Sequence, residues 1–425
     1  MELNKKEIFF YNMAGNNFQG LFLQFPFKHF KSKIIPIKKL SQFKEKNLNF
    51  ILVSFLDIDN KWNNKNYKLL NLLNKEHIDL INNGVVKLLI DYSLEGWNLE
   101  YMGFSKMLDI LKDKNINGNN VYFICADLKL KDTYNSLYKN LFEKINIIGI
   151  NVCIIYLRNW EIFDVDVENL RPKKFVCLNA LLRRDRRLLI TELFRSGLDK
   201  EGFITAMGRS SKIHKQFPNL QYYPETHEDV NRIFLENEIP FNIKDEKIIQ
   251  KYYEKVILPK LPIFTDIDHA LMKSNNKDVD EQYLNTIFPK FYTDSYFSIV
   301  TETSFNWNTE SVFDNGVFLS EKIWKPIFGM QPFVVFSNTY YLKILRDLGF
   351  KTFPEFFDES YDEVEDPIER FYMIFDEIKK VCSLSIEEIH DKYNSIFNKL
   401  IYNRQKLLEM LDVDNFKNSI IKEFK

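Results

Sequence analysis

The chain has 425 residues, of which 45% are hydrophobic and 15% aromatic, and its formal net charge is −1. This composition excludes an intrinsically disordered chain, and the length allows two domains that each bury a core. The near-neutral charge argues against a general attraction to nucleic acid or to an anionic membrane, so any anion-binding site has to be local.

The four cysteines show no spacing typical of a metal site, and three of them lie in apolar, strand-like runs where a thiol behaves as a small hydrophobe. No stretch of about 18 uninterrupted apolar residues occurs, and the start of the chain lacks the apolar run of a secretion signal. We therefore expect a cytoplasmic protein without a transmembrane segment, with peripheral association with a membrane left open.

Strands and helices alternate regularly from Phe50 onward, whereas the first 45 residues give no clear assignment. The pattern predicts apolar strands at 50–55, 85–92, 121–126 and 151–157, and amphipathic helices at 66–81, 101–111 and 133–144. Such alternation is typical of a parallel sheet covered on both faces. The first part of the chain is thus predicted to be a Rossmann-like domain, although no G-x-G-x-x-G fingerprint opens it.

Arg171-Pro172 is interpreted as a joint between two domains, because proline restricts its neighbour and the preceding residues are polar and acidic. A second α/β unit is expected after it, with a strand at 174–179 and a helix at 185–196. The predicted domains are 1–168 on the acceptor side and 169–400 on the donor side, and the C-terminal helix at 401–425 is expected to pack back on the first domain.

A cluster of arginines stands where the predicted strand ending at Asn179 is followed by a helix. Its members are Arg183, Arg184, Arg186 and Arg187. Ligands of open α/β sheets bind at this edge, and the planar guanidinium group matches phosphate oxygens. The alternative is an exposed helix face whose arginines pair with Asp185 and Glu192.

The segment from 297 to 336 places a charged pair at a predicted helix start between two apolar strands, 297–300 and 333–336. Ser320 is a good N-cap, so Glu321 and Lys322 fall in the first turn, where backbone N–H groups and the helix dipole favour an anion. Glu321 can accept hydrogen bonds from two vicinal hydroxyls, so the pair can hold a ribose and a diphosphate. The alternative is an ordinary solvated helix start.

The same segment resembles the donor-site signature of the α1,3-fucosyltransferase-like, GT-B-fold glycosyltransferases. In that family an apolar strand ends in Phe-Glu-Asn-Ser, and aromatic-x-Thr-Glu-Lys-Leu-Trp opens a helix that is followed by Gly-x-x-Pro. The matching residues are Glu302, Ser304, Phe318, Glu321, Lys322, Trp324, Gly329 and Pro332. Thr303 replaces the family asparagine, the segment between Glu302 and Glu321 is longer, and Pro326 lies within the helix.

This resemblance implies an α/β fold of two Rossmann-like domains facing a central cleft. It also implies transfer of a sugar from a nucleotide-diphosphate donor, such as a GDP-fucose-like molecule, to a hydroxyl of a glycan. The reaction is expected to be inverting and metal-independent, and the nucleotide sugar is a co-substrate, so no cofactor is expected. Glu321 is assigned to the ribose, Lys322 to the diphosphate and Glu302 to the neighbourhood of the sugar.

The resemblance extends to the arginine segment. Arg186 is the best match to the phosphate-binding arginine of the family, with Arg183 and Arg187 next. The remaining substrate-binding candidates are Asn179, Ser304 and Phe318.

An inverting displacement needs a carboxylate that takes the proton of the acceptor hydroxyl. Glu95 and Asp91 lie at the end of the predicted strand 85–92, and the family keeps an acidic residue in a comparable loop, so both are candidates for the base. Acidic residues at strand ends also serve solubility or helix capping, which is the alternative for each of them.

Two further readings compete with this one. The triplets Asp57-Ile58-Asp59 and Asp266-Ile267-Asp268 match the Asp-x-Asp pattern of metal-dependent glycosyltransferases, but two carboxylates alone do not complete a metal site, and no zinc-type histidine spacing occurs. We therefore expect no bound metal. The other reading is a non-catalytic protein that binds glycan or nucleic acid through residues 183–187, and the net charge argues against nucleic acid as a partner.

Overall fold

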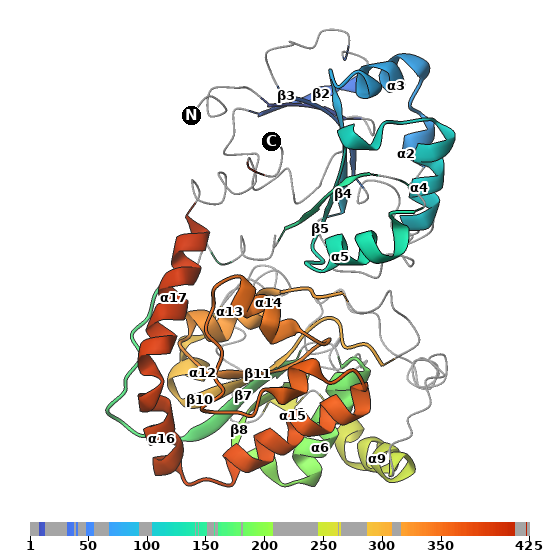
Figure 1. Cartoon of the computed structure of the whole chain (residues 1–425). Coiled ribbons are helices and arrows are strands. Elements are labelled where there is room, and N and C mark those ends of the chain that lie inside the picture. The colour runs from blue at the N-terminus through green and yellow to red at the C-terminus, as the bar shows by residue number, and fades with distance from the viewer. Residues whose placement is uncertain are drawn as a thin grey trace. The chain divides into compact units, whose positions relative to one another are not determined.

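The computed structural model describes residues 8–12, 32–37, 40, 48–54, 68–92, 104–140, 142, 144–150, 157, 160–179, 182–206, 245–261, 263–264, 287–307, 316–412 and 422. The chain forms two compact units. The first contains residues 1–155, 311–319 and 409–425, and the second contains residues 156–310 and 320–408. Each unit is built on its own sheet (Figure 1).

The first unit is organised around a parallel sheet of six strands in the order β2-β1-β3-β4-β5-β6. Its strands are β1 (Ile8–Asn12), β2 (Ser32–Pro36), β3 (Leu48–Ser54), β4 (Lys87–Tyr92), β5 (Val121–Cys125) and β6 (Asn146–Gly149). Every residue of β5 and the four central residues of β4 are buried. Such continuous burial is expected of parallel strands that are covered on both faces.

Helices follow the central strands of this unit. They are α2 (Lys68–Asn71), α3 (Lys75–Asn82), α4 (Phe104–Asp113) and α5 (Leu130–Thr133), which continues as a π-helical turn at Tyr134–Tyr138. The ring of Phe104 meets that of Phe123 edge-on at 5.1 Å, which fixes α4 on the sheet. The predicted helix at 66–81 is in fact two helices, because Asn74 accepts a hydrogen bond from the His77 amide and so starts α3 anew.

The second unit contains a five-stranded sheet in the order β11-β10-β7-β8-β9. Its strands are β7 (Lys173–Asn179), β8 (Gly202–Ala206), β9 (Ile263–Phe264), β10 (Ser295–Thr301) and β11 (Phe333–Phe336). All neighbours are parallel except β9, which runs antiparallel to β8. The predicted strands at 174–179, 297–300 and 333–336 are confirmed.

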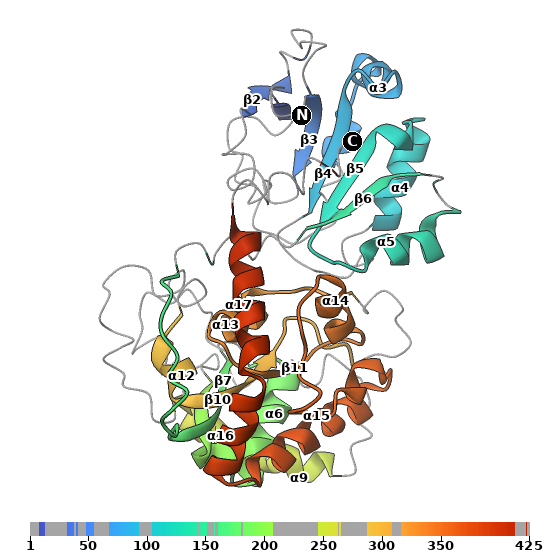
Figure 2. The ribbon, with the colours of Figure 1, turned by 60° about the vertical axis from the view of Figure 1, so that its left-hand side comes forward.

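Helices of the second unit pack on this sheet, with α13 against β10, α15 against β11, and α6 beside α9 (Figures 1 and 2). The helices are α6 (Arg184–Arg195), α9 (Glu246–Tyr252), α12 (Pro289–Thr293), α13 (Glu321–Phe328), α14 (Tyr341–Asp347), α15 (Pro367–Cys382), α16 (Ile386–Ser395) and α17 (Phe397–Leu411). The helices α16 and α17 are separated at Ile396, which ends α16. Residues 351–353 after α14 form no strand, and the Phe353 amide donates to the Glu359 carboxylate.

The predicted joint at Arg171-Pro172 lies inside the second unit. The Arg171 guanidinium stands over the ring of Tyr393 at 4.0 Å, and its Nη1 donates to the Ser295 carbonyl at 2.7 Å. These contacts tie the segment before β7 to α16 and β10, so the division between the units falls at residue 155 instead. Of the residues predicted as a separate C-terminal helix, 401–408 belong to the second unit.

Both units have the alternating β/α organisation of Rossmann-like folds, so the predicted α/β class with two such units is confirmed. Among the helices of the described ranges, none combines the length and the apolar character needed to cross a bilayer.

Candidate functional site

The strand order of the second sheet creates a switch point between β7 and β10. The chain leaves β7 toward β8 on one side and leaves β10 toward β11 on the other. In open α/β sheets, ligands bind at the carboxyl ends of the strands where the direction changes in this way. Here those ends are Asn179 and Thr301, and the Thr301 hydroxyl donates to Asn179 Oδ1 at 2.6 Å. The candidate site is therefore this edge of the second sheet.

Two of the predicted arginines reach the end of β10 from the start of α6. Arg186 is 4% exposed, and its Nη2 donates to the carbonyl oxygens of Thr301 at 3.2 Å and Glu302 at 3.1 Å. Arg183 is exposed, and its Nη1 donates to the Thr303 carbonyl at 2.6 Å. Arg187 is buried and donates to the Leu182 carbonyl, so it supports the turn that leads into α6. Of Arg183, Arg186 and Arg187, Arg183 is thus the best placed to meet a ligand.

Glu302 connects β10 to the start of α13. Its side chain is 1% exposed, and Oε1 accepts hydrogen bonds from the Ser320 amide at 3.2 Å and the Tyr341 hydroxyl at 2.7 Å. Oε2 accepts from the Thr303 amide at 3.2 Å. Burial raises the pKa of Glu302, while the Lys322 charge and the bonds from Ser320 and Tyr341 oppose that rise. These partners make Glu302 an anchor for the helix start.

The first turn of α13 has the predicted N-cap. Ser320 Oγ accepts hydrogen bonds from the Lys322 amide at 3.2 Å and from Lys322 Nζ at 3.1 Å. The same Nζ lies 2.9 Å from Glu321 Oε1. Burial acts to raise the pKa of Glu321, but the charges of Lys322 and Lys325 outweigh it and hold the pKa below its ordinary value. Glu321 is therefore an ionised hydrogen-bond acceptor at neutral pH.

Lys325 adds a second positive charge one turn further along α13. Burial lowers the pKa of Lys325 to about 8; the Glu321 charge raises it, and the Lys322 charge lowers it again. An anion bound near the helix start would favour the protonated form of this lysine.

The other substrate-binding candidates occupy less accessible places. Asn179 is buried, and its amide donates to Cys177 Sγ at 3.2 Å. Ser304 is half-buried, and its carbonyl accepts a hydrogen bond from the Ser337 hydroxyl at 3.4 Å. Phe318 is buried in the segment 311–319, which belongs to the first unit.

Acidic residues gather at the carboxyl ends of β4 and β5 in the first unit. Asp91 is buried near the end of β4, opposite Ser54 and Ile124, while Glu95 lies outside the described residues. Sequence reasoning missed Asp127, which accepts hydrogen bonds from the amides of Lys129 and Val317 at 2.9 Å each. Burial raises the pKa of Asp127 to about 6. The position of Asp127 directly after the predicted strand 121–126 is the signal that could have identified it from the sequence.

The Asp-x-Asp triplets at 57–59 and 266–268 also lie outside the described residues. Within the described ranges, no group of three or more histidine, cysteine, aspartate or glutamate side chains is arranged to hold a metal ion.

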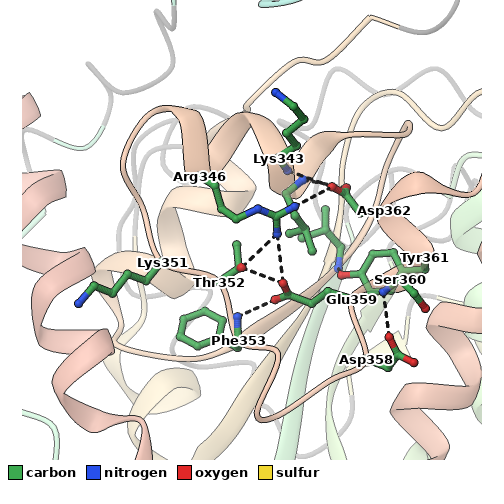
Figure 3. Close-up of polar contacts among 12 residues, drawn as sticks. Lys343, Arg346, Lys351, Thr352, Phe353, Asp358, Glu359, Ser360, Tyr361 and Asp362 are labelled. Atoms are coloured by element: carbon green, nitrogen blue, oxygen red, sulfur yellow. Dashed lines mark hydrogen bonds and ion pairs between the residues drawn. The ribbon is translucent and has the colours of Figure 1, made fainter.

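The acidic run at 358–362 has a structural role (Figure 3). Glu359 accepts hydrogen bonds from the Thr352 hydroxyl at 2.7 Å and the Phe353 amide at 2.6 Å. Asp362 accepts from the amides of Leu342 and Lys343 at 2.8 and 2.9 Å, and so caps α14 from outside the helix. This cluster fixes the start of α14 and the segment that follows the helix.

Comparison with known proteins gives little similarity. No protein-family model matches the chain, and no curated protein matches it. One solved structure that it resembles is described as the DNA-modifying enzyme β-glucosyltransferase in the presence and absence of the substrate uridine diphosphoglucose. That chain is 11% identical, the alignment covers 96% of this chain and 99% of that one, and the TM-score is 0.29.

Proposed function

We propose that the protein is a glycosyltransferase that takes a sugar from a nucleotide-diphosphate donor bound at the β7/β10 edge of the second sheet. The observation that carries this proposal is the convergence of two helix starts on one residue. Arg186 of α6 donates to the Glu302 carbonyl, and the Glu302 side chain accepts from Ser320 at the start of α13. The positive charges at the starts of α6 and α13 therefore come together at the end of β10, where they can bind an anionic ligand.

The groups at this edge match the parts of a nucleoside diphosphate. Lys322 and Arg183 are exposed enough to meet phosphate oxygens, while buried Arg186 holds the strand end between them. Glu321 forms an ion pair with Lys322. When a phosphate oxygen pairs with Lys322, the ribose hydroxyls can donate hydrogen bonds to the ionised Glu321. The ion pair then separates, with Lys322 bound to the diphosphate and Glu321 bound to the ribose.

The transfer step is proposed as an inverting displacement. Asp91 or Glu95 of the first unit takes the proton of the acceptor hydroxyl as its oxygen attacks the anomeric carbon, and the nucleoside diphosphate leaves. Lys322, Lys325 and Arg183 provide the charge that stabilises this leaving group, which supports a metal-independent reaction. A fucose-like sugar and a glycan acceptor are the finer hypotheses, and they rest on the donor-motif resemblance alone.

A ligand panel tests this function. Thermal unfolding is followed with GDP, UDP, GDP-fucose, UDP-glucose and pyrophosphate, with and without a chelator. Ligands that bind the folded state raise the melting temperature; a ligand at 100 times its Kd adds about 2.7 kcal/mol of stability. We expect at least one nucleoside diphosphate and its sugar to give such a shift, unchanged by the chelator. If none of these compounds shifts the transition, the proposed function is wrong.

A further inference from the structure

A buried carboxylate lies in the first turn of α6, beside the arginines of the candidate site. Asp185 is the second residue of this 12-residue helix and is 6% exposed. Its carboxylate accepts hydrogen bonds from its own amide and from the Arg186 amide, two of the amides that a helix start leaves without an acceptor within the helix. Asp185 therefore uses part of its hydrogen-bonding capacity to stabilise the start of α6.

One oxygen of this carboxylate is left over. Asp185 Oδ2 is buried, and among the residues that the structure describes none forms a hydrogen bond with it. Buried polar atoms nearly always have a partner in the protein, a water molecule or a ligand, and this holds for a carboxyl group in either protonation state. Since no described residue fills this place, the oxygen is available to a donor on a bound molecule.

Two charge interactions place the Asp185 carboxylate at the β7/β10 edge. Burial raises the pKa of Asp185, while the positive charges of Arg186 and Arg183 oppose that rise. Both arginines also contact the end of β10, because Arg186 donates to the Thr301 carbonyl and Arg183 donates to the Thr303 carbonyl. Arg183 is exposed and Arg186 is buried, so a ligand would approach Asp185 from the side of Arg183.

The carboxylates of this edge divide among different partners. Glu302 is expected beside the sugar from the sequence, but both of its oxygens accept hydrogen bonds from residues of the protein. Glu321 is proposed to bind the ribose. We infer that Asp185 accepts a hydrogen bond from a hydroxyl of the sugar that is transferred, an inference that rests on the proposed function.

A sugar hydroxyl fits this place better than a phosphate oxygen does. The hydroxyl brings a proton that Oδ2 can accept, whereas an ionised phosphate oxygen has no proton to donate and repels a carboxylate. Arg183, next to Asp185, is then the group that meets the diphosphate. A buried acceptor that only the correct hydroxyl satisfies also selects among sugars, because an analogue without that hydroxyl leaves the acceptor unpaired.

The test compares Asp185→Asn with the wild-type protein by calorimetric titration with GDP, UDP, GDP-fucose and UDP-glucose. The variant should bind the nucleotide sugar that the wild-type protein binds about tenfold more weakly, because an NH₂ group that cannot accept replaces a charged oxygen. Its affinity for the matching nucleoside diphosphate should not fall, since a negative charge beside the arginines is removed. The melting temperature should not fall either, because the asparagine oxygen can still accept from the helix amides.

Analogues of the bound nucleotide sugar that each lack one sugar hydroxyl identify the group that Asp185 contacts. One of these analogues should bind the wild-type protein about tenfold more weakly than the complete nucleotide sugar does. Asp185→Asn should bind that analogue and the complete nucleotide sugar with nearly equal affinity. A residue with a purely structural role would not change this discrimination.

Asp366 provides the matched control. It caps α15 in the same unit, where its carboxylate accepts hydrogen bonds from the amides of Ile368 and Glu369, but it is exposed. Asp366→Asn makes the same chemical change at a helix start outside the candidate site. It should leave the affinities for nucleotide and nucleotide sugar unchanged.

Equal affinity of Asp185→Asn and the wild-type protein for the nucleotide sugar would assign the unpaired oxygen to a water molecule and overturn the sugar contact, while the proposed function would stand. Equal weakening of nucleoside diphosphate and nucleotide sugar would also overturn it, because the loss would not come from the sugar. If the wild-type protein binds none of these probes, the proposed function itself fails.

Discussion

Lys322→Ala should weaken the binding of a nucleoside diphosphate by roughly 10- to 150-fold, because it removes one charge-assisted hydrogen bond worth about 1.5–3 kcal/mol. Lys322 Nζ already lies at the helix start, within 3.1 Å of Ser320 Oγ and 2.9 Å of Glu321. Its charge is thus held where phosphate oxygens would meet the first-turn amides of α13. Calorimetric titration of the wild-type and variant proteins with GDP and UDP measures the difference.

Lys379→Ala is the matched control for this prediction. Lys379 lies on α15 in the same unit and forms a surface ion pair with Asp376 at 2.6 Å. Its removal takes away the same charge but should leave binding unchanged, because the residue is not part of the candidate site. Equal affinity of Lys322→Ala and wild-type protein would remove Lys322 from the proposed phosphate site.

Glu302→Ala should lower the free energy of unfolding of the second unit by about 3 kcal/mol or more, since it leaves the Ser320 amide and the Tyr341 hydroxyl buried without their acceptor. Glu302→Gln keeps one oxygen for these two donors and should cost about 1 kcal/mol. Tyr341→Phe removes one of the donors and should cost a similar amount. Denaturant unfolding of the three variants measures these losses.

The pH dependence gives an independent check on Glu302. Burial holds the pKa of Glu302 above its ordinary value of 4.5, so the folded protein binds this proton more tightly than the unfolded chain does. The associated stabilisation is present below pH 4.5 and is lost as the pH rises through the folded pKa. Glutamine does not titrate, so the penalty of Glu302→Gln should shrink as the pH rises. A penalty that grows with pH would show that Glu302 is stabilised as the charged form.

The sequence predicted the central strands of both sheets and the start of α13, because these depend on local patterns. Apolar runs of the right length mark β10 and β11, and a serine before an acidic residue marks the N-cap. The strands β1 and β2 were missed. β2 is an edge strand of five residues, SKIIP. Each of its residues pairs with a residue of β1 that lies 24 positions earlier in the chain, and no local pattern reveals such a pairing.

The arginines show a second limit of sequence reasoning. Spacing on a helix does not show which side chains face the sheet, and Arg186, the best match to the family, is buried against the carbonyl oxygens of Thr301 and Glu302. Glu302 was expected beside the sugar, yet its carboxylate is taken up by Ser320, Tyr341 and Thr303. Both outcomes depend on contacts between residues far apart in the chain. Their predicted roles as ligand contacts therefore remain predictions.

Hydrogen–deuterium exchange with and without bound GDP or UDP tests the location of the site most directly. If a diphosphate is held between the starts of α6 and α13, ligand binding should slow exchange in peptides that cover residues 182–188 and 318–324 together, because first-turn amides of both helices become hydrogen-bonded or shielded. Slower exchange confined to the first unit, or to α15–α17, would place the ligand elsewhere and contradict the account.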